Sequence, residues 1–225
     1  QQTAALWLRG ILEHDFGVSQ YKIHWYMERS EEMSHGGATG FKPPAGISFH
    51  RIAPNQSLVS TLLDNELDVA HVASPFALQA NTLDRSSRIT GKGNWSKIRP
   101  LFPDRMAEGA RFYKTHGFLP VNHTYIIRGD VYKKYPWVAF NLYTGFVKAK
   151  ALAREKMAER IPSGLFFGPE YAAMTREMIG DDPFPFGINA NQAMLETIIG
   201  YSHEQGLTPR KMKIEELFAE STLGL

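Results

Sequence analysis

The sequence contains no cysteine, and this absence excludes several kinds of site. Its 225 residues offer no thiol for a disulfide, an iron–sulfur cluster, a thiolate zinc site or a cysteine nucleophile. No apolar run reaches the roughly 18 residues that a membrane helix requires. A basic excess is missing too, since 25 Lys and Arg against 23 Asp and Glu leave a net charge of +2. We therefore expect no membrane insertion and no nucleic-acid partner, because nucleic-acid binding requires basic residues in excess on one face.

Familiar catalytic motifs are missing as well. The sequence has neither a Walker phosphate loop nor a G-x-S-x-G nucleophile motif. Gly36 and Gly37 after His35 have no such motif to accompany them, and we interpret them as a flexible loop. The eight histidines include no i, i+4 helical pair and no H-x-H strand pair, the spacings that aim two imidazoles at one ion. We therefore predict neither a metal nor a cofactor, and only a metal site assembled from distant segments stays open.

The first half of the chain predicts strands interleaved with helices. Apolar residues recur at helical spacing from Thr3 to Leu12. Because the sequence has no initiator methionine and opens in a helix, we expect further residues upstream. Alternation over 22–28 predicts a strand, with Ile23, Trp25 and Met27 on one face and His24, Tyr26 and Glu28 on the other. The remaining predicted elements are a polar loop at 29–46, strands at 47–53 and 67–73, a helix capped by Ser57 that runs to Asp64, and an irregular segment at 75–103.

The second half predicts mainly helices. A helix is expected at 104–116, closed by Gly117, and the alternating segment 121–128 is expected to be a strand. Pro136 fits the first position of a long amphipathic helix that runs to about Arg160. The two last predicted helices are 169–179, before Gly180, and 189–205, before Gly206. We therefore assign the chain to the α/β class, with a helical C-terminal half.

Short segments in order along the whole chain carry a resemblance. They are Gln2 to Leu12, Val121 to Arg128, Tyr135 to Trp137, Asp181 to Gly187, Glu204 to Leu207 and Glu215 to Phe218. Together these segments resemble the 4,5-dihydroxyphthalate decarboxylase family. The resemblance implies the architecture of type II periplasmic binding proteins, in which two α/β lobes are joined by crossover strands and hold the ligand between them.

The same resemblance predicts how the chain is divided. Residues 1–118 are expected to form an α/β lobe whose N-terminal helix faces the ligand. Residues 119–225 are expected to supply a crossover strand and C-terminal helices that pack on the other lobe. Family members carry a further segment before the first helix, so we expect this sequence to lack most of the N-terminal lobe. If that lobe never existed, Trp7, Leu101 and the C-terminal helices are expected to bury apolar surface against a second copy of the chain.

Decarboxylation of an aromatic ring requires a cationic anchor for the spectator carboxylate. Arg9 is the predicted anchor, because a guanidinium can hold a carboxylate through two parallel hydrogen bonds. Gln2 lies on the same helical face, and Thr3 stands at the helix start, where backbone N–H groups attract anions. A surface ion pair between Arg9 and Glu13 at i, i+4 is the structural alternative.

The reaction also requires a proton donor for the ring carbon. His123 is the predicted acid, since imidazole titrates near neutral pH and the resemblance places this residue beside the cleft. Asn122 and Thr124 are further substrate-binding candidates. The alternatives are that His123 makes a structural hydrogen bond, and that Trp25, a candidate for stacking on an aromatic ligand, packs in the core.

Two functions of different classes follow from these residues. The first is a cofactor-independent decarboxylase, acting in the cytoplasm, that converts a hydroxylated aromatic dicarboxylate such as 4,5-dihydroxyphthalate to protocatechuate. The second is the solute-binding protein of a transporter, acting in the periplasm, in which Arg9 holds an aromatic or other organic anion and no reaction follows. Binding requires the anchor but no titrating acid.

Overall fold

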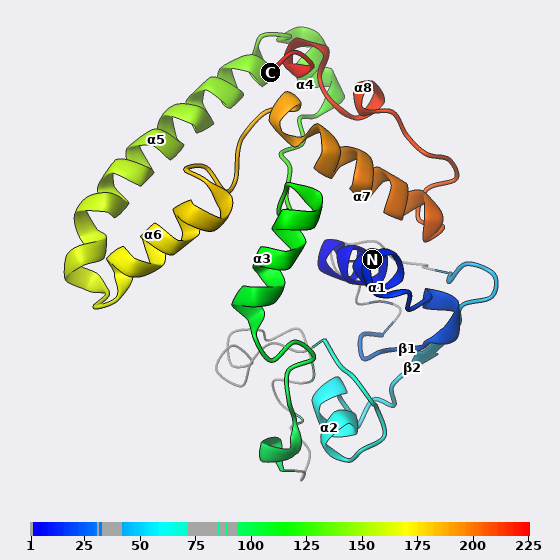
Figure 1. The fold of residues 1–225 in the computed structure, drawn as a ribbon. Helices are drawn as coiled ribbons and strands as arrows, with labels where there is room; N and C mark the ends of the chain where they lie inside the picture. Colours follow the sequence, from blue (N-terminus) through cyan, green and yellow to red (C-terminus); the bar gives the residue numbers. More distant parts are fainter. Residues whose placement is uncertain (1, 31, 33–41, 72–84, 86–88, 90–93) are drawn as a thin grey trace. The chain divides into compact units, whose positions relative to one another are not determined.

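The computed structural model describes residues 2–30, 32, 42–71, 85, 89 and 94–225. The chain divides into two compact units, Gln1–Pro103 and Asp104–Leu225. Helices dominate the described residues, whose one sheet is a pair of parallel strands in the first unit (Figure 1). This mixture is compatible with the α/β class, and the two-lobe architecture and its boundary at residue 118 stay predictions.

The elements of the first unit are α1 (Thr3–Phe16), η1 (Gln20–Lys22), β1 (His24–Met27), β2 (Ser48–Arg51), α2 (Leu58–Leu63) and η5 (Trp95–Lys97). The elements of the second unit are α3 (Arg105–His116), α4 (Gly129–Lys134), α5 (Val138–Gly164), α6 (Gly168–Ile179), η6 (Asn189–Asn191), α7 (Gln192–Glu204), α8 (Ile214–Leu217) and η7 (Glu220–Thr222).

Helix α1 confirms the helix predicted from Thr3. It buries Leu6, Trp7 and Gly10, and it ends where Gly17 adopts a left-handed φ of 68°, which glycine tolerates without steric cost. Trp7 is only 3% exposed within this chain, so the expectation that it buries its ring against a second copy is wrong. Leu101 is 53% exposed, so for this residue the expectation stays a prediction.

Strands β1 and β2 confirm the strands predicted at 22–28 and 47–53, with shorter bounds. They pair in parallel, and His24 lies opposite Ser48 while Trp25 lies opposite Phe49. Exposure alternates along β1 as predicted: His24 and Tyr26 are exposed, whereas Trp25 is half-buried. The strand pair therefore presents two chemically different faces.

Glu28 departs from the predicted alternation, because it is only 4% exposed. Its carboxylate accepts a hydrogen bond of 2.8 Å from the backbone N–H of Leu58, the first residue of α2. A negative charge at a helix N-terminus is favourable, and this contact ties the end of β1 to α2. Ser57 caps the same helix by accepting from the N–H of Ser60 at 3.0 Å, and Asp64 ends it, as predicted.

Two other predicted strands are wrong. Residues 67–71 and 121–128 are irregular, while 72 and 73 lie outside the described residues. A strand requires a neighbour for its backbone hydrogen bonds, and within the described residues the pairing is confined to β1 and β2. Tyr125 and Ile126 are instead 77% and 92% exposed. The predicted loops at 29–46, with Gly36 and Gly37, and at 75–103 lie largely outside the described residues.

The C-terminal helices follow their predicted capping signals. Asp104 accepts hydrogen bonds from the backbone N–H groups of Met106 and Ala107, and Gly117 closes α3 with a φ of 74°. Helix α6 ends at Gly180, and α7 is followed by Gly206 with a φ of 66°. The helices predicted at 104–116, 169–179 and 189–205 are thus confirmed.

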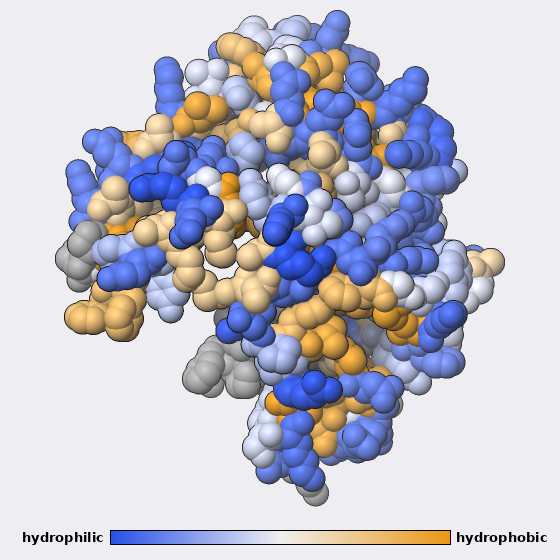
Figure 2. Space-filling view, viewed as in Figure 1, coloured by the Kyte–Doolittle hydropathy of each residue, from blue (hydrophilic) through white to orange (hydrophobic). Residues whose placement is uncertain are grey.

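Helix α5 begins later than predicted. Trp137 is its N-cap, so Pro136 precedes the helix instead of occupying its first position, and the short α4 before it was not predicted. Helices α5 and α6 lie side by side as a hairpin (Figure 1). At their turn Leu165, Phe166 and Phe167 are exposed, and Figure 2 shows an apolar group there. No helix in the described part of the chain has both the length and the apolar character needed to cross a membrane.

A charged contact holds the segment after α6 against α5. The ammonium of Lys150 lies 2.6 Å from Oδ1 of Asp182, also donates to the carbonyl of Phe184, and lies 4.5 Å from the ring centroid of Phe186. Burial alone raises the pKa of Asp182, but the hydrogen bond and the charge of Lys150 outweigh it, and the net pKa is lowered.

We predict that Asp182→Asn lowers the free energy of unfolding by about 1 kcal/mol at neutral pH, because it weakens a partly exposed charged hydrogen bond. A lowered folded-state pKa stabilises the protein above the unfolded value of about 3.9, and that stability is lost as the pH falls through the folded pKa. The difference between wild type and Asp182→Asn should therefore shrink below about pH 4. Urea denaturation across this pH range measures it.

Asp181→Asn is the matched control. Asp181 pairs with Arg176 at 3.0 Å, but the two side chains are 83% and 72% exposed, so this pair should contribute little. Equal losses of unfolding free energy in the two variants at neutral pH would show that the contact with Lys150 stabilises the protein no more than the exposed pair does.

Candidate functional site

The predicted anchor, Arg9, lies on α1 and is half-buried. Its guanidinium carbon lies 5.7 Å from the centroid of the Trp25 ring, a distance typical of a cation–π contact. Burial lowers the pKa of Arg9 from its ordinary value, because the charged group loses hydration. Glu13, the partner in the alternative surface pair, accepts a hydrogen bond from the hydroxyl of Ser19 at 3.3 Å.

Trp25 is fixed by both the sheet and a hydrogen bond. It lies opposite Phe49 in the strand pair, and its indole N–H donates to the carbonyl of Gln20 at 2.9 Å. Gln20 is itself only 4% exposed. The indole thus has a defined orientation and supports the guanidinium of Arg9. This role differs from both of the predicted ones, core packing and stacking on a ligand.

Gln2 and Thr3 occupy the start of the helix that carries Arg9. Gln2 is the N-cap residue, and its carbonyl accepts the N–H of Leu6 at 3.0 Å, while its side chain makes no capping hydrogen bond. The first turn of α1 carries no acidic side chain. Arg9 lies seven positions after Gln2, which is about 10 Å along the helix axis.

The remaining predicted residues belong to the second unit. Asn122, His123 and Thr124 are all exposed, in the irregular segment between α3 and α4. The neighbouring Tyr125 stacks on Phe146 of α5, with ring centroids 4.3 Å apart. Because this segment is not a strand, its side chains do not alternate between two faces. The convergence of this group with Arg9 on one ligand stays a prediction.

A polar cluster on the exposed face of the β1–β2 pair was not predicted. Nδ1 of His24 lies 2.7 Å from Oγ of Ser48, which in turn lies 3.0 Å from Nε2 of His50. Histidine spacing within one strand could not reveal this cluster, because its imidazoles come from two strands. The sequence signal that could have revealed the cluster was the prediction of two strands, at 22–28 and 47–53, each of which contains one of these histidines.

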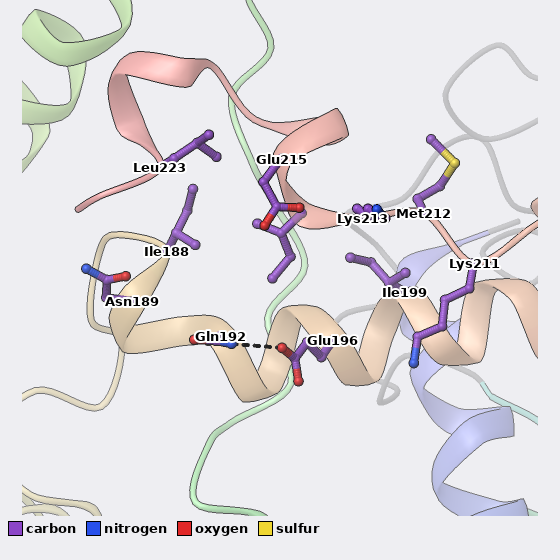
Figure 3. Close-up of a pocket in the computed structure, with 11 residues that line it drawn as sticks. Ile188, Asn189, Gln192, Glu196, Ile199, Lys211, Met212, Lys213, Glu215 and Leu223 are labelled. Atoms are coloured by element: carbon purple, nitrogen blue, oxygen red, sulfur yellow. Dashed lines mark hydrogen bonds between the residues drawn. The ribbon is translucent and has the colours of Figure 1, made fainter.

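The second unit also contains a hollow of about 450 Å³ beside α7 (Figure 3). Apolar side chains of Ile188 and Ile199 line it together with the charged Lys211 and Glu196, which accepts a hydrogen bond from Gln192 at 2.9 Å. Its volume suits a small molecule. The described residues that line it include none of the predicted site residues.

Comparison with known proteins gives a distant similarity along the whole chain. No protein-family model matches. The chain is 25% identical over 225 residues to a 4,5-dihydroxyphthalate decarboxylase of Comamonas testosteroni, an alignment that covers 99% of this chain. The chain spans 64% of the length of that relative. The similarity supports a distant relationship to a decarboxylase.

We predict that Arg9 and Trp25 stabilise the first unit jointly. In a double-mutant cycle with Arg9→Met and Trp25→Leu, the coupling free energy should be about 0.5 to 2 kcal/mol, because each change removes the same cation–π contact. The hydrogen bond from the indole to Gln20 is lost in both arms that lack Trp25, so its contribution cancels. Urea denaturation of the four proteins measures the coupling.

The exposed Arg99 of the same unit provides the control. Arg99→Met combined with Trp25→Leu should be additive. Additivity of the Arg9 and Trp25 changes as well would contradict the contact.

Proposed function

We propose that this protein is a cofactor-independent decarboxylase of a hydroxylated aromatic dicarboxylate such as 4,5-dihydroxyphthalate. The observation that carries the proposal is the similarity, along 99% of the chain, to a protein that bears the name of this reaction. The half-buried guanidinium of Arg9 adds a chemical reason, because a dianionic aromatic substrate requires a cationic anchor.

In this proposal Arg9 binds the carboxylate that stays on the ring. A guanidinium that stacks through its face still donates hydrogen bonds through its edge, so the contact with Trp25 is compatible with a bidentate carboxylate. Burial has already removed part of the water around the cation, and a bound anion compensates that loss. Trp25 then acts by positioning Arg9, while Gln2 and Thr3 meet other polar groups of the same substrate.

His123 supplies the proton in this proposal. The imidazolium transfers its proton to the ring carbon that bears the departing carboxylate. The bond from the ring to that carboxylate then breaks, its electron pair returns to the ring, and carbon dioxide leaves. The neutral imidazole regains a proton from water, so the cycle consumes a proton and requires no oxidant or reductant.

In this proposal residues 1–118 form the lobe that carries Arg9. Residues 119–225 present His123, with Asn122 and Thr124 beside it for hydrogen bonding to the same substrate. The exposure of these three side chains supports this part of the proposal, since a group that meets a ligand must be accessible.

We predict that Arg9→Ala and His123→Ala change different kinetic constants. Arg9→Ala should raise KM for 4,5-dihydroxyphthalate by about 10- to 100-fold, because a charged hydrogen bond contributes about 1.5–3 kcal/mol. His123→Ala should lower kcat by about 100-fold or more and leave KM nearly unchanged, because it removes the general acid. Release of carbon dioxide and formation of protocatechuate by the purified proteins measure both constants.

Arg99→Ala, at an exposed arginine, should retain both constants. If the purified wild-type protein binds 4,5-dihydroxyphthalate and releases no carbon dioxide, the decarboxylase proposal is wrong, and binding without reaction is its function. If His123→Ala keeps the wild-type kcat, another group donates the proton.

A further inference from the structure

The exposed face of the β1–β2 pair gathers two imidazoles around one hydroxyl. The register places His24 opposite Ser48 and Tyr26 opposite His50, so all four side chains project from one face. The ring centroids of His24 and His50 are 6.2 Å apart. Tyr26 stacks on His50 with centroids 5.0 Å apart, which restricts the orientation of that imidazole.

The two histidines direct ring nitrogens at a common point. Nδ1 of His24 and Nε2 of His50 lie 2.7 Å and 3.0 Å from the same atom, Oγ of Ser48. A hydroxyl has one proton, so Ser48 can donate to only one of these nitrogens at a time. If both imidazoles are neutral and carry their proton on the other ring nitrogen, Nδ1 of His24 and Nε2 of His50 each direct a lone pair at Ser48. The hydroxyl proton can then satisfy only one of these two lone pairs.

We propose that His24 and His50 bind a divalent transition-metal cation between Nδ1 and Nε2. The two nitrogens now lie 2.7 Å and 3.0 Å from Oγ of Ser48, so both imidazoles move inward when they bind the cation, because zinc–nitrogen bonds are about 2.0–2.1 Å long. Rotation of the small Ser48 side chain about χ1 vacates the position between the two nitrogens at little cost. Imidazole nitrogen is a ligand that zinc, nickel and copper all accept, whereas magnesium and calcium prefer oxygen.

The site has two protein ligands. In the described part of the chain, no group of three or more His, Cys, Asp or Glu side chains could hold a metal ion. Because His24 and His50 are exposed, water completes the coordination shell and the cation remains accessible to an additional ligand. This inference does not depend on decarboxylation, because it rests on the exposed face of the strand pair, opposite the face that carries Trp25.

Titration of the purified protein with zinc chloride at about pH 8, above the usual pKa of histidine, tests the site. We expect one zinc ion per chain at this site, and His24→Ala and His50→Ala should each weaken its binding by at least about tenfold, as loss of a metal-supporting group does. Ser48→Ala should keep or strengthen binding, because the hydroxyl competes for the position and is not a ligand.

His203→Ala provides the control and should keep the zinc affinity of the wild type. This histidine is exposed, and its described hydrogen bond is to the carbonyl of Thr208. Nitrogen NMR of the imidazoles gives an independent readout: zinc should shift Nδ1 of His24 and Nε2 of His50. Circular dichroism shows whether each variant is folded. Zinc affinity that survives either replacement in a folded variant, or shifts confined to other histidines, would overturn the proposal.

Discussion

The parallel pairing of two short strands is the constraint on which the chemistry of the first unit depends. Its register turns Trp25 toward one face, where the indole supports the guanidinium of Arg9. The same register turns His24, Ser48 and His50 toward the other face, where they form a polar cluster. Two strands alone are only marginally stable, so their neighbours matter. The buried carboxylate of Glu28 provides one such support by binding the first N–H of α2.

Arg9 illustrates how the fold makes a charge useful. A guanidinium in full solvent would bind a carboxylate weakly, because water competes for both partners. Here the helix places Arg9 over an oriented indole, which compensates part of its desolvation and restricts its motion. The proposed chemistry divides its tasks between the units: the first supplies the anchor within a packed environment, and the second supplies an accessible imidazole at His123.

Local signals were sufficient for several helices and their ends, although α4 was missed and α5 begins later than predicted. Asp104, Gly117 and Gly180 act through hydrogen bonds or backbone conformations within a few residues, so the sequence contains all that is needed to recognise them. The strand prediction at 121–128 was wrong because an alternating pattern shows only that a segment could form a strand. A strand also requires a neighbouring strand to pair with, and the segment's own sequence does not show whether that neighbour exists.

The candidate site shows the same limit. Arg9 and Trp25 could each be singled out from the sequence, but their contact depends on how α1 packs on β1. Alternation placed Glu28 on the same face as His24 and Tyr26 and gave no sign of its burial, because its partner in α2 lies thirty residues away, beyond any periodic pattern. The pair of His24 and His50 escaped a search for closely spaced histidines, because the register of two strands brings them together.

The central claim of the proposed function is that Arg9 and His123 contact the same aromatic dicarboxylate. Nuclear Overhauser measurements on the protein with bound phthalate test it directly, because phthalate keeps both carboxylates but lacks the hydroxyl groups that make the ring easy to protonate. The account predicts contacts from the phthalate ring protons to the side chains of both Arg9 and His123. Contacts confined to one of these residues, or to the hollow beside α7, would contradict it.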